Sequence, residues 1–201
     1  MKEILFVLLN EFADWEASPL AAAINEKEDF CVKTVSSTKN AVVSMGGFTV
    51  IPDYDISEAL NRDFAGIILI GGKSWRTKEA QQVRELVDLA VQKKAVIGAI
   101  CDATVYLGSL GVLNTIDHTS NQLQDLESFA GDRYSGASRY KIQQAVRSEN
   151  IVTANGTANL EFAREVLLAL NCMSNEEAEQ WYRIYKLGYY EAIKNTPLDT
   201  E

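Results

Sequence analysis

The stretch "KKAVIGAICDATVYLGSLGVL" (residues 93–113) places a cysteine, Cys101, between two segments of different periodicity. The apolar run from Ala95 to Ile100 is short and continuous, which is typical of a strand buried on both faces of a sheet. A helical pattern begins directly afterwards at Asp102. A single residue therefore connects a buried strand to a helix, and that residue carries a thiol.

Buried strands and helices alternate along the rest of the chain. Further apolar runs cover residues 3–9, 65–72 and 150–156, and helical patterns cover about 15–26, 78–93 and 159–171. A half-buried strand is predicted for residues 30–37, followed by a hairpin around Gly46 and Gly47. This alternation, with glycines at strand ends, predicts an α/β fold whose mostly parallel sheet carries helices on both faces. Ligands bind such sheets beyond the carboxyl ends of the strands.

The composition indicates a globular protein of one domain. A chain of 201 residues can bury a full core, and its formal net charge is −9. This charge argues against nucleic acid and against anionic membrane surfaces as partners, because both recruit clustered Lys and Arg. No apolar run reaches the roughly 18 residues of a membrane-spanning helix, and the N-terminal run is too short for a signal peptide. We therefore expect a cytoplasmic protein.

The three cysteines, Cys31, Cys101 and Cys172, are widely spaced and odd in number. This pattern fits a reducing compartment better than a disulfide framework. The chain has one histidine and no paired-cysteine motif, so we expect no metal site and no cofactor. Cys31 and Cys172 fit the common role of a structural thiol.

The position of Cys101 fits a nucleophile elbow, a sharp strand-to-helix turn that exposes its central side chain. Such a turn needs small residues two positions before and after the nucleophile, here Ala99 and Ala103. The helix that begins at Asp102 directs its positive dipole end at the sulfur, which favours the thiolate, and its N–H groups could hold an oxyanion. Asp102 is explained as a stabilising first-turn acid, although its charge opposes a thiolate unless it pairs elsewhere. A buried structural thiol is the alternative for Cys101.

The ends of the other strands supply candidate partners for this thiol. The segment "NEFADWEASPL" carries Glu11, Asp14 and Glu16, and a carboxyl there could exchange a proton with Cys101, although first-turn acids also simply stabilise helices. His118 is the only possible imidazole partner, with polar surface as the alternative.

The segment "GIILIGGKSW" (residues 66–75) does not fit a phosphate-binding loop, because that pattern requires a glycine where this chain has Ile67. Gly71 and Gly72 instead indicate a tight turn whose N–H groups border the site.

Five motifs in the same order resemble the ThiJ/PfpI family of the class I glutamine amidotransferase-like superfamily. The similarity covers residues 1 to about 171. We predict a single domain over residues 1–201. Its C-terminal extension begins at about residue 174, contains a closing helix over 175–195 and lies outside the similarity. The motifs are a glutamate after the first strand, a strand ending in Gly-Gly, a cysteine elbow and two late segments: "ADWEAS", "ILIGG", "AICDA", "IVTANGTA" and "LEFA".

This resemblance implies a flavodoxin-like three-layer sandwich, a homodimer and a reactive cysteine at Cys101. It also implies that Glu16 is a protonated acid hydrogen-bonded to the thiol, and that the N–H groups of Gly72 and Asp102 form an oxyanion hole. Activities in the family range from peptidase-like and glutamine-amidotransferase-like to glyoxalase-type hydration, isocyanide hydration, chaperone activity and oxidative-stress sensing. The fold therefore does not choose the reaction.

The chain departs from the family pattern at two positions. Peptidase-like members have a histidine directly after the cysteine, and this chain has Asp102. Other members have a histidine after a Thr-rich segment, where this chain has Asn121, and His118 lies three residues earlier. These departures weaken a Cys–His–acid triad, and they disfavour protease activity most.

Three hypotheses follow from these features. The first is a cysteine-dependent enzyme of hydrolase or hydratase/glyoxalase type that acts on a small electrophile such as a carbonyl, amide or isocyanide. In it Cys101 attacks, Glu16 transfers the proton and the backbone N–H groups of the elbow and of Gly72 stabilise the oxyanion. The second is an oxidative-stress or redox-sensing protein without a dedicated substrate, in which Cys101 oxidises to a sulfinate. The third is a partner-binding module whose site is vestigial.

Overall fold

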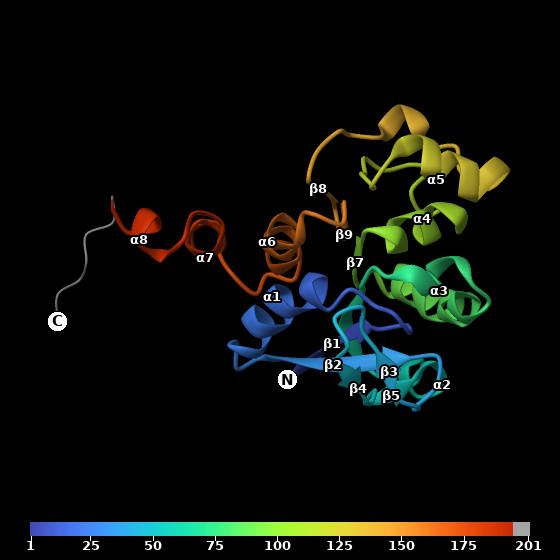
Figure 1. The fold of residues 1–201 in the computed structure, drawn as a ribbon, viewed down its shortest axis with the longest axis horizontal. Coiled ribbons are helices and arrows are strands. Elements are labelled where there is room, and N and C mark those ends of the chain that lie inside the picture. The colour runs from blue at the N-terminus through green and yellow to red at the C-terminus, as the bar shows by residue number, and fades with distance from the viewer. Residues whose placement is uncertain (195–201) are drawn as a thin grey trace.

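The computed structural model describes residues 1–194 and contains a seven-stranded sheet with helices on both faces (Figure 1). The strand order is β5-β2-β1-β6-β7-β9-β8, and only the β8–β9 pair is antiparallel. The strands of this sheet are β1 (Lys2–Val7), β2 (Phe30–Ser36), β5 (Tyr54–Asp55), β6 (Phe64–Leu69), β7 (Val96–Ile100), β8 (Ala145–Ser148) and β9 (Ile151–Ala154). A separate hairpin pairs β3 (Val42–Val43) with β4 (Thr49–Val50).

The helices form two layers. Helices α1 (Asp14–Asn25) and α6 (Asn159–Ala169) pack on one face of the sheet. The opposite face is covered by α2 (Ile56–Ala59), α3 (Arg84–Lys93), α4 (Asp102–Ser109) and α5 (Leu123–Ala130). Short 3-10 helices complete the connections: η1 (Lys73–Arg76), η2 (Glu79–Val83), η3 (Gly131–Arg133) and η4 (Ala137–Arg139).

Alternating side chains of the central strands explain this layering. In β1, Leu5 and Val7 belong to the core under α3 and α4, whereas Ile4 and Phe6 belong to the core under α1 and α6. All four side chains are at most 1% exposed. A strand that is apolar on both faces is stable only between two helical layers, so the continuous apolar runs of the sequence account for the sandwich.

The predicted fold class, a flavodoxin-like α/β sandwich of three layers, is confirmed. The structure differs from the predicted elements in several places. The helix predicted over 78–93 begins as the 3-10 helix η2 and becomes α-helical only at Arg84. Helix α5 and the antiparallel edge strand β8 have no counterpart in the prediction.

The closing helix predicted over 175–195 is divided in the structure into α7 (Asn175–Leu187) and α8 (Tyr189–Ala192). The division is at Gly188, whose φ of +87° interrupts helical geometry. Helix α7 begins with a capping box on Ser174 and is tied to α6 through Glu161, which accepts hydrogen bonds from Tyr182 and Lys186. Asn195 and the predicted end of the domain, 195–201, lie outside the described residues. No helix in the described part of the chain is long and apolar enough to cross a membrane.

Candidate active site

Cys101 lies at the carboxyl edge of the sheet, between β7 and the first residue of α4. Its backbone has φ 59° and ψ −130°, a conformation that L-residues rarely adopt and that costs free energy. Hydrogen bonds hold it there: the Cys101 N–H donates to Ala154 O at 3.0 Å, and the Cys101 carbonyl accepts from the Thr104 hydroxyl at 2.6 Å. The nucleophile elbow expected from the sequence is thus present as a strained turn with a half-buried thiol.

Two glycines allow the chain to close around the thiol. A Cβ atom added to Gly71 would lie 2.6 Å from the Cys101 Cβ, and one added to Gly156 would lie 2.8 Å from the sulfur. Neither distance is compatible with a side chain. Gly156, within the "IVTANGTA" motif, therefore belongs to the site, although the sequence predicts no site role for it.

Glu16, in the first turn of α1, is the carboxyl that meets the thiol. Its side chain is 1% exposed, accepts a hydrogen bond from the Gly71 N–H at 2.9 Å and lies beside Cys101, against the same two glycines, Gly71 and Gly156. Burial raises the pKa of Glu16 to about 7, the charge of Asp102 adds to this rise, and the hydrogen bonds from Gly71 and Cys101 oppose it. The protonated and ionised forms of Glu16 are therefore both populated near neutral pH.

The thiol itself differs from the sequence expectation, which was a thiolate favoured by the helix dipole. Burial and the neighbouring Glu16 carboxylate raise the pKa of Cys101, while hydrogen bonds from Asn121 and from the Asp102 N–H act in the opposite direction. The two buried acids oppose each other's ionisation, so at neutral pH the pair holds at least one proton.

Asn121 is a contact of the sulfur to which the sequence analysis gave no role. Its Nδ2 donates to Cys101 Sγ at 3.3 Å, and its Oδ1 accepts from the Gly156 N–H at 2.8 Å. The signal was nonetheless available, because the resemblance placed the histidine of other family members at this position. An amide replaces that histidine, and it can orient the sulfur but cannot remove its proton.

His118 is not a partner of Cys101, and this corrects the prediction. The imidazole is fully buried, with Nδ1 2.8 Å from the Ile116 carbonyl oxygen and Nε2 2.7 Å from the Tyr134 hydroxyl. Since a carbonyl only accepts, Nδ1 carries the proton and Nε2 accepts from Tyr134. Burial lowers the pKa of His118, so the ring is neutral. The chain's single imidazole is thus occupied by structural hydrogen bonds.

Asp102 turns its carboxylate away from the thiol. Arg76 donates from Nε to Asp102 Oδ2 at 2.8 Å and from Nη1 to Asp125 Oδ1 at 3.0 Å, which joins the start of α4 to the first turn of α5. The Asp102 N–H, at the start of α4, lowers the pKa of the Cys101 thiol, against the rise that burial causes.

Gly72, the second predicted member of the oxyanion hole, lies against the loop after β1. A Cβ atom on Gly72 would be 2.7 Å from Phe12 Cα, and the φ of +154° also favours glycine there. Gly72 pairs with Phe12 in an isolated bridge, and the N–H of the neighbouring Gly71 donates to Glu16.

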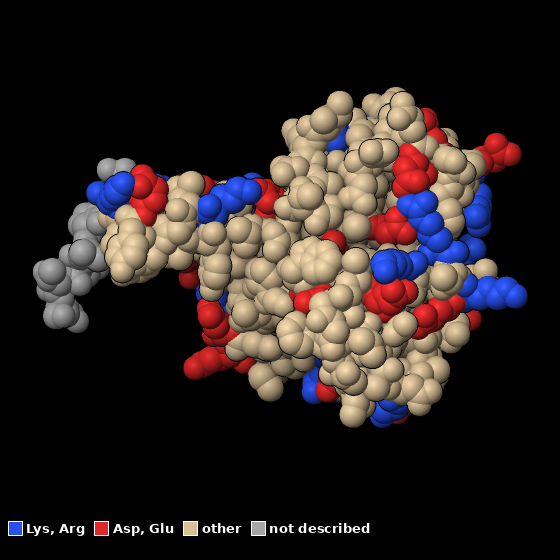
Figure 2. Space-filling model, in the orientation of Figure 1, with Lys and Arg blue, Asp and Glu red and all other residues tan. Residues whose placement is uncertain are grey.

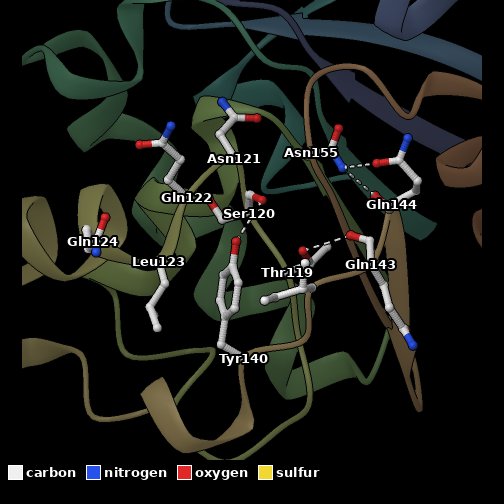
Figure 3. A pocket seen from close by; sticks show the side chains of 11 residues that line it. Thr119, Ser120, Asn121, Gln122, Leu123, Gln124, Tyr140, Gln143, Gln144 and Asn155 are labelled. Carbon is white, nitrogen blue, oxygen red and sulfur yellow. Dashed lines mark hydrogen bonds between the residues drawn. The ribbon is translucent and has the colours of Figure 1, made fainter.

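A cavity of about 560 Å³ lies between the loop before α5 and the segment before β8 (Figure 3). Asn121, which touches the sulfur, is also one of the residues that line this cavity. The residues that line the cavity are Thr119, Ser120, Asn121, Gln122, Leu123, Gln124, Tyr140, Ile142, Gln143, Gln144 and Asn155.

Among residues 1–194, no cluster of three or more His, Cys, Asp or Glu could hold a metal ion.

Comparison with known proteins agrees with this geometry. The DJ-1/PfpI family profile matches residues 2–169, which include the elbow, Glu16 and Asn121. The chain belongs to the DJ-1/PfpI family. It is 38% identical over 191 residues to the "uncharacterized protease YdeA" of Bacillus subtilis, and the match covers 94% of each chain.

Two solved structures of DJ-1/PfpI proteins are similar over nearly the whole chain. A DJ-1 superfamily protein, Atu0886 of Agrobacterium tumefaciens, is 32% identical with a TM-score of 0.85, covering 93% of this chain and 98% of the other. A ThiJ/PfpI family protein of Bacillus anthracis is 31% identical with a TM-score of 0.87, covering 96% and 93%. The family resemblance predicted from the five motifs is confirmed.

Proposed function

We propose that this DJ-1/PfpI protein is a cysteine-dependent enzyme, of hydrolase or hydratase/glyoxalase type, that acts on a small electrophilic substrate. The observation that carries this proposal is the Cys101 thiol on a strained elbow with the buried Glu16 carboxyl beside it, both of them against Gly71 and Gly156. A carboxyl whose pKa is raised to about 7 can accept and return a proton at neutral pH, which is what general acid–base catalysis requires.

The proposed chemistry, written for a carbonyl substrate, begins with the protonated thiol. As the Cys101 sulfur attacks the carbonyl carbon, the S–H proton passes to the ionised Glu16 and a C–S bond forms. The electron pair of the carbonyl π bond moves to oxygen, where the Asp102 N–H and, in our proposal, the Gly72 N–H stabilise the charge. Glu16 then returns the proton to that oxygen, so the step balances without another reactant.

Protease activity is disfavoured in this proposal, although the Bacillus subtilis relative carries "protease" in its name. A cysteine protease uses an imidazole to activate the thiol and to protonate the leaving amine. The only histidine of this chain, His118, is bonded to Ile116 and Tyr134 instead.

A pH–rate profile with a panel of carbonyl, amide and isocyanide substrates tests the proposal. Turnover is expected to rise as pH increases through about 7, because Glu16 must be ionised to accept the thiol proton. Glu16→Gln is expected to lower turnover by about 10²-fold or more. Full activity in this variant would refute the role of Glu16 and, with it, the proposal.

Redox sensing is the second candidate function, and the donors around the sulfur favour it. Asn121 Nδ2 contacts the sulfur, and in this proposal it holds the oxygens of a sulfinate together with the Asp102 N–H at the start of α4 and a protonated Glu16. Mild peroxide followed by mass spectrometry tests it. Oxidation of Cys101 to sulfinate before Cys31 or Cys172 would support this candidate, and the reverse order would exclude it.

For partners, we propose that the protein is a cytoplasmic homodimer that acts on a small molecule and binds neither nucleic acid nor membrane. Five exposed apolar side chains support a second copy as the partner: Trp15, Val43, Met45, Phe48 and Ile51, which we call the hairpin patch. Hydrogen bonds of Met45 and Gly46 to Phe12 and Asp14 hold the hairpin against the start of α1. Charged side chains are sparse over the middle of this face (Figure 2). Sedimentation of the wild type and of Phe48→Glu tests this proposal, and a monomeric wild type would refute it.

A further inference from the structure

We propose that the cavity beside Cys101 binds an uncharged, polar substrate, and that the electrophilic group is one end of a molecule larger than a two- or three-carbon carbonyl. This inference rests on the proposed function, because it names the class of substrate for the same thiol. We call the cavity the amide pocket, defined by the eleven lining residues given above.

The lining of the amide pocket carries no acidic or basic side chain. Six of its eleven residues are asparagine or glutamine, and the others are Thr, Ser, Tyr, Leu and Ile. In a chain with 23% charged residues, this is a neutral surface next to the thiol. A charged ligand placed there would lose water without gaining a countercharge, so the pocket disfavours carboxylates, phosphates and amines.

Three of the six amides, those of Asn121, Asn155 and Gln144, are already engaged, and they complete the walls of the pocket. Asn121 bridges the sulfur and the Gly156 N–H, and Asn155 donates to Gln144 Oε1 at 2.6 Å. The Asn155 oxygen accepts from the N–H and hydroxyl of Thr157. These three side chains therefore have fixed orientations and set the shape of the site.

Three other amides have ends that are available to a ligand. The side chains of Gln122, Gln124 and Gln143 are exposed and make no hydrogen bond with the described residues. Figure 3 shows Gln122 and Gln124 on one side of the pocket and Gln143 on the opposite side. Each amide offers one acceptor oxygen and two N–H donors. A complementary ligand therefore carries both donors and acceptors, such as hydroxyl, amide or carbonyl groups.

The size of the amide pocket indicates the length of the ligand. Its volume of about 560 Å³ falls within the range of about 300–1,000 Å³ typical of sites for drug-sized ligands. Cys101 itself does not line the pocket, but Asn121 both lines it and contacts the sulfur. In our proposal a ligand that fills the pocket therefore extends past Asn121 to the thiol. The electrophilic carbon would react at Cys101, and the rest of the molecule would lie between the glutamines.

Alkylating reagents with different tails test this inference directly. We would use iodoacetamides whose amide nitrogen carries a tris(hydroxymethyl)methyl, n-butyl, carboxyethyl or aminoethyl group, and follow Cys101 modification by mass spectrometry. The hydroxylated reagent is expected to show saturable kinetics, with a half-saturating concentration at least tenfold below those of the charged reagents. Rates with glutathione correct for the intrinsic reactivity of each reagent.

Variants separate the amide pocket from the overall negative charge of the protein. Gln122→Ala combined with Gln143→Ala is expected to raise the half-saturating concentration of the hydroxylated reagent at least fivefold and to leave its limiting rate unchanged. Gln82→Ala, the matched control, removes an exposed glutamine of η2 outside the amide pocket and should change neither value. Equal half-saturation for all four tails, or an unaffected double variant, would overturn the inference.

A binding measurement distinguishes failure of this inference from failure of the proposed function. The corresponding acetamides, which lack the leaving group, are titrated into Cys101→Ser and followed by NMR. Tighter binding of the hydroxylated acetamide, weakened by the double glutamine variant, supports the pocket even if Cys101 proves unreactive. No preference among the four acetamides overturns the inference while leaving a reactive Cys101, and so the proposed function, intact.

Discussion

Cys101–Glu16 and His118–Tyr134 are both pairs of neighbouring titratable groups in buried surroundings, and their difference explains which pair is suited to chemistry. Cys101 has a strained backbone, and Glu16 has a pKa raised to about 7. His118 has a partner for each ring nitrogen, and its ring also packs edge-on against Tyr134 and Tyr140. A group whose hydrogen bonds are all satisfied stabilises the fold, whereas a group held in an unfavourable state can react.

The largest expected effect is on turnover, which should depend on Cys101 and not on His118. Cys101→Ser should lower turnover by about 10³-fold or more, because a hydroxyl is a far weaker nucleophile than a thiol without a strong base beside it. His118→Phe should keep turnover within about threefold of wild type, since His118 touches no reacting atom. Steady-state kinetics on purified variants checks this. Loss of activity in a folded His118→Phe variant would show that His118 takes part in the reaction.

The next effect concerns stability, and Glu16 gives it a characteristic pH dependence. Its pKa is about 7 in the folded protein against a reference of 4.5, so the folded state holds its proton more tightly and stability falls as pH rises between these values. The loss amounts to about 3 kcal/mol above pH 7. Glu16→Gln should therefore be more stable than wild type at pH 8 by up to about 3 kcal/mol and similar to it at pH 4.5.

Urea denaturation at pH 4.5, 6 and 8 measures this difference. Cys31→Ser serves as the control, because it changes a residue remote from the pair and should follow the wild-type curve. A Glu16→Gln variant that loses stability at pH 8 would show that the carboxylate is well solvated in the folded state.

The contribution of His118 to the stability of the fold should be smaller than that of Glu16 and should have the opposite pH dependence. Burial lowers the pKa of its ring, so the unfolded chain binds a proton more readily and stability falls as pH drops below about 6.5. His118→Phe should remove this dependence and cost about 1–3 kcal/mol at pH 8, because the Tyr134 hydroxyl and the Ile116 carbonyl lose their partner. The same denaturation series tests it, and a destabilisation that grows toward low pH would contradict it.

The smallest expected effect lies at the edge of the reactive pair, at Arg76. Arg76→Gln leaves the Asp102 charge uncompensated, and that charge raises the pKa of both Cys101 and Glu16. Iodoacetamide should then modify Cys101 about two- to fivefold more slowly at pH 8. Global stability should change by less than about 1 kcal/mol, because the Arg76 pairs are partly exposed. An unchanged alkylation profile would show that the Asp102 charge does not reach the thiol.

The fold could be predicted from the sequence because each central strand carries its own signal. The apolar runs of β1, β6 and β7 need no knowledge of distant segments, and the turn between β7 and α4 located Cys101 from local periodicity alone. Glu16 came from the family resemblance, since three acids follow the first strand and spacing does not distinguish among them.

The parts of the site that were missed depend on contacts between distant segments. Asn121 and Gly156 meet the sulfur only because the loop before α5 and the loop after β9 converge on the elbow. The prediction for His118 was wrong because its partners are set by the conformation of the segment 117–140, where neither α5 nor the paired tyrosine was predicted. A lone histidine carries no sequence signal for whether its nitrogens are already occupied.

The close approach of Gly156 to the sulfur has a stereochemical consequence. Gly156 lies against one side of Cys101, and Gly71 and Glu16 lie against another, so a carbon bonded to the sulfur has few directions open to it. In our proposal the open direction is the one past Asn121 toward the amide pocket. A prochiral carbonyl held in that direction presents one of its two faces to the thiol. We therefore expect an adduct, and any product derived from it with a new stereocentre, to form as a single enantiomer.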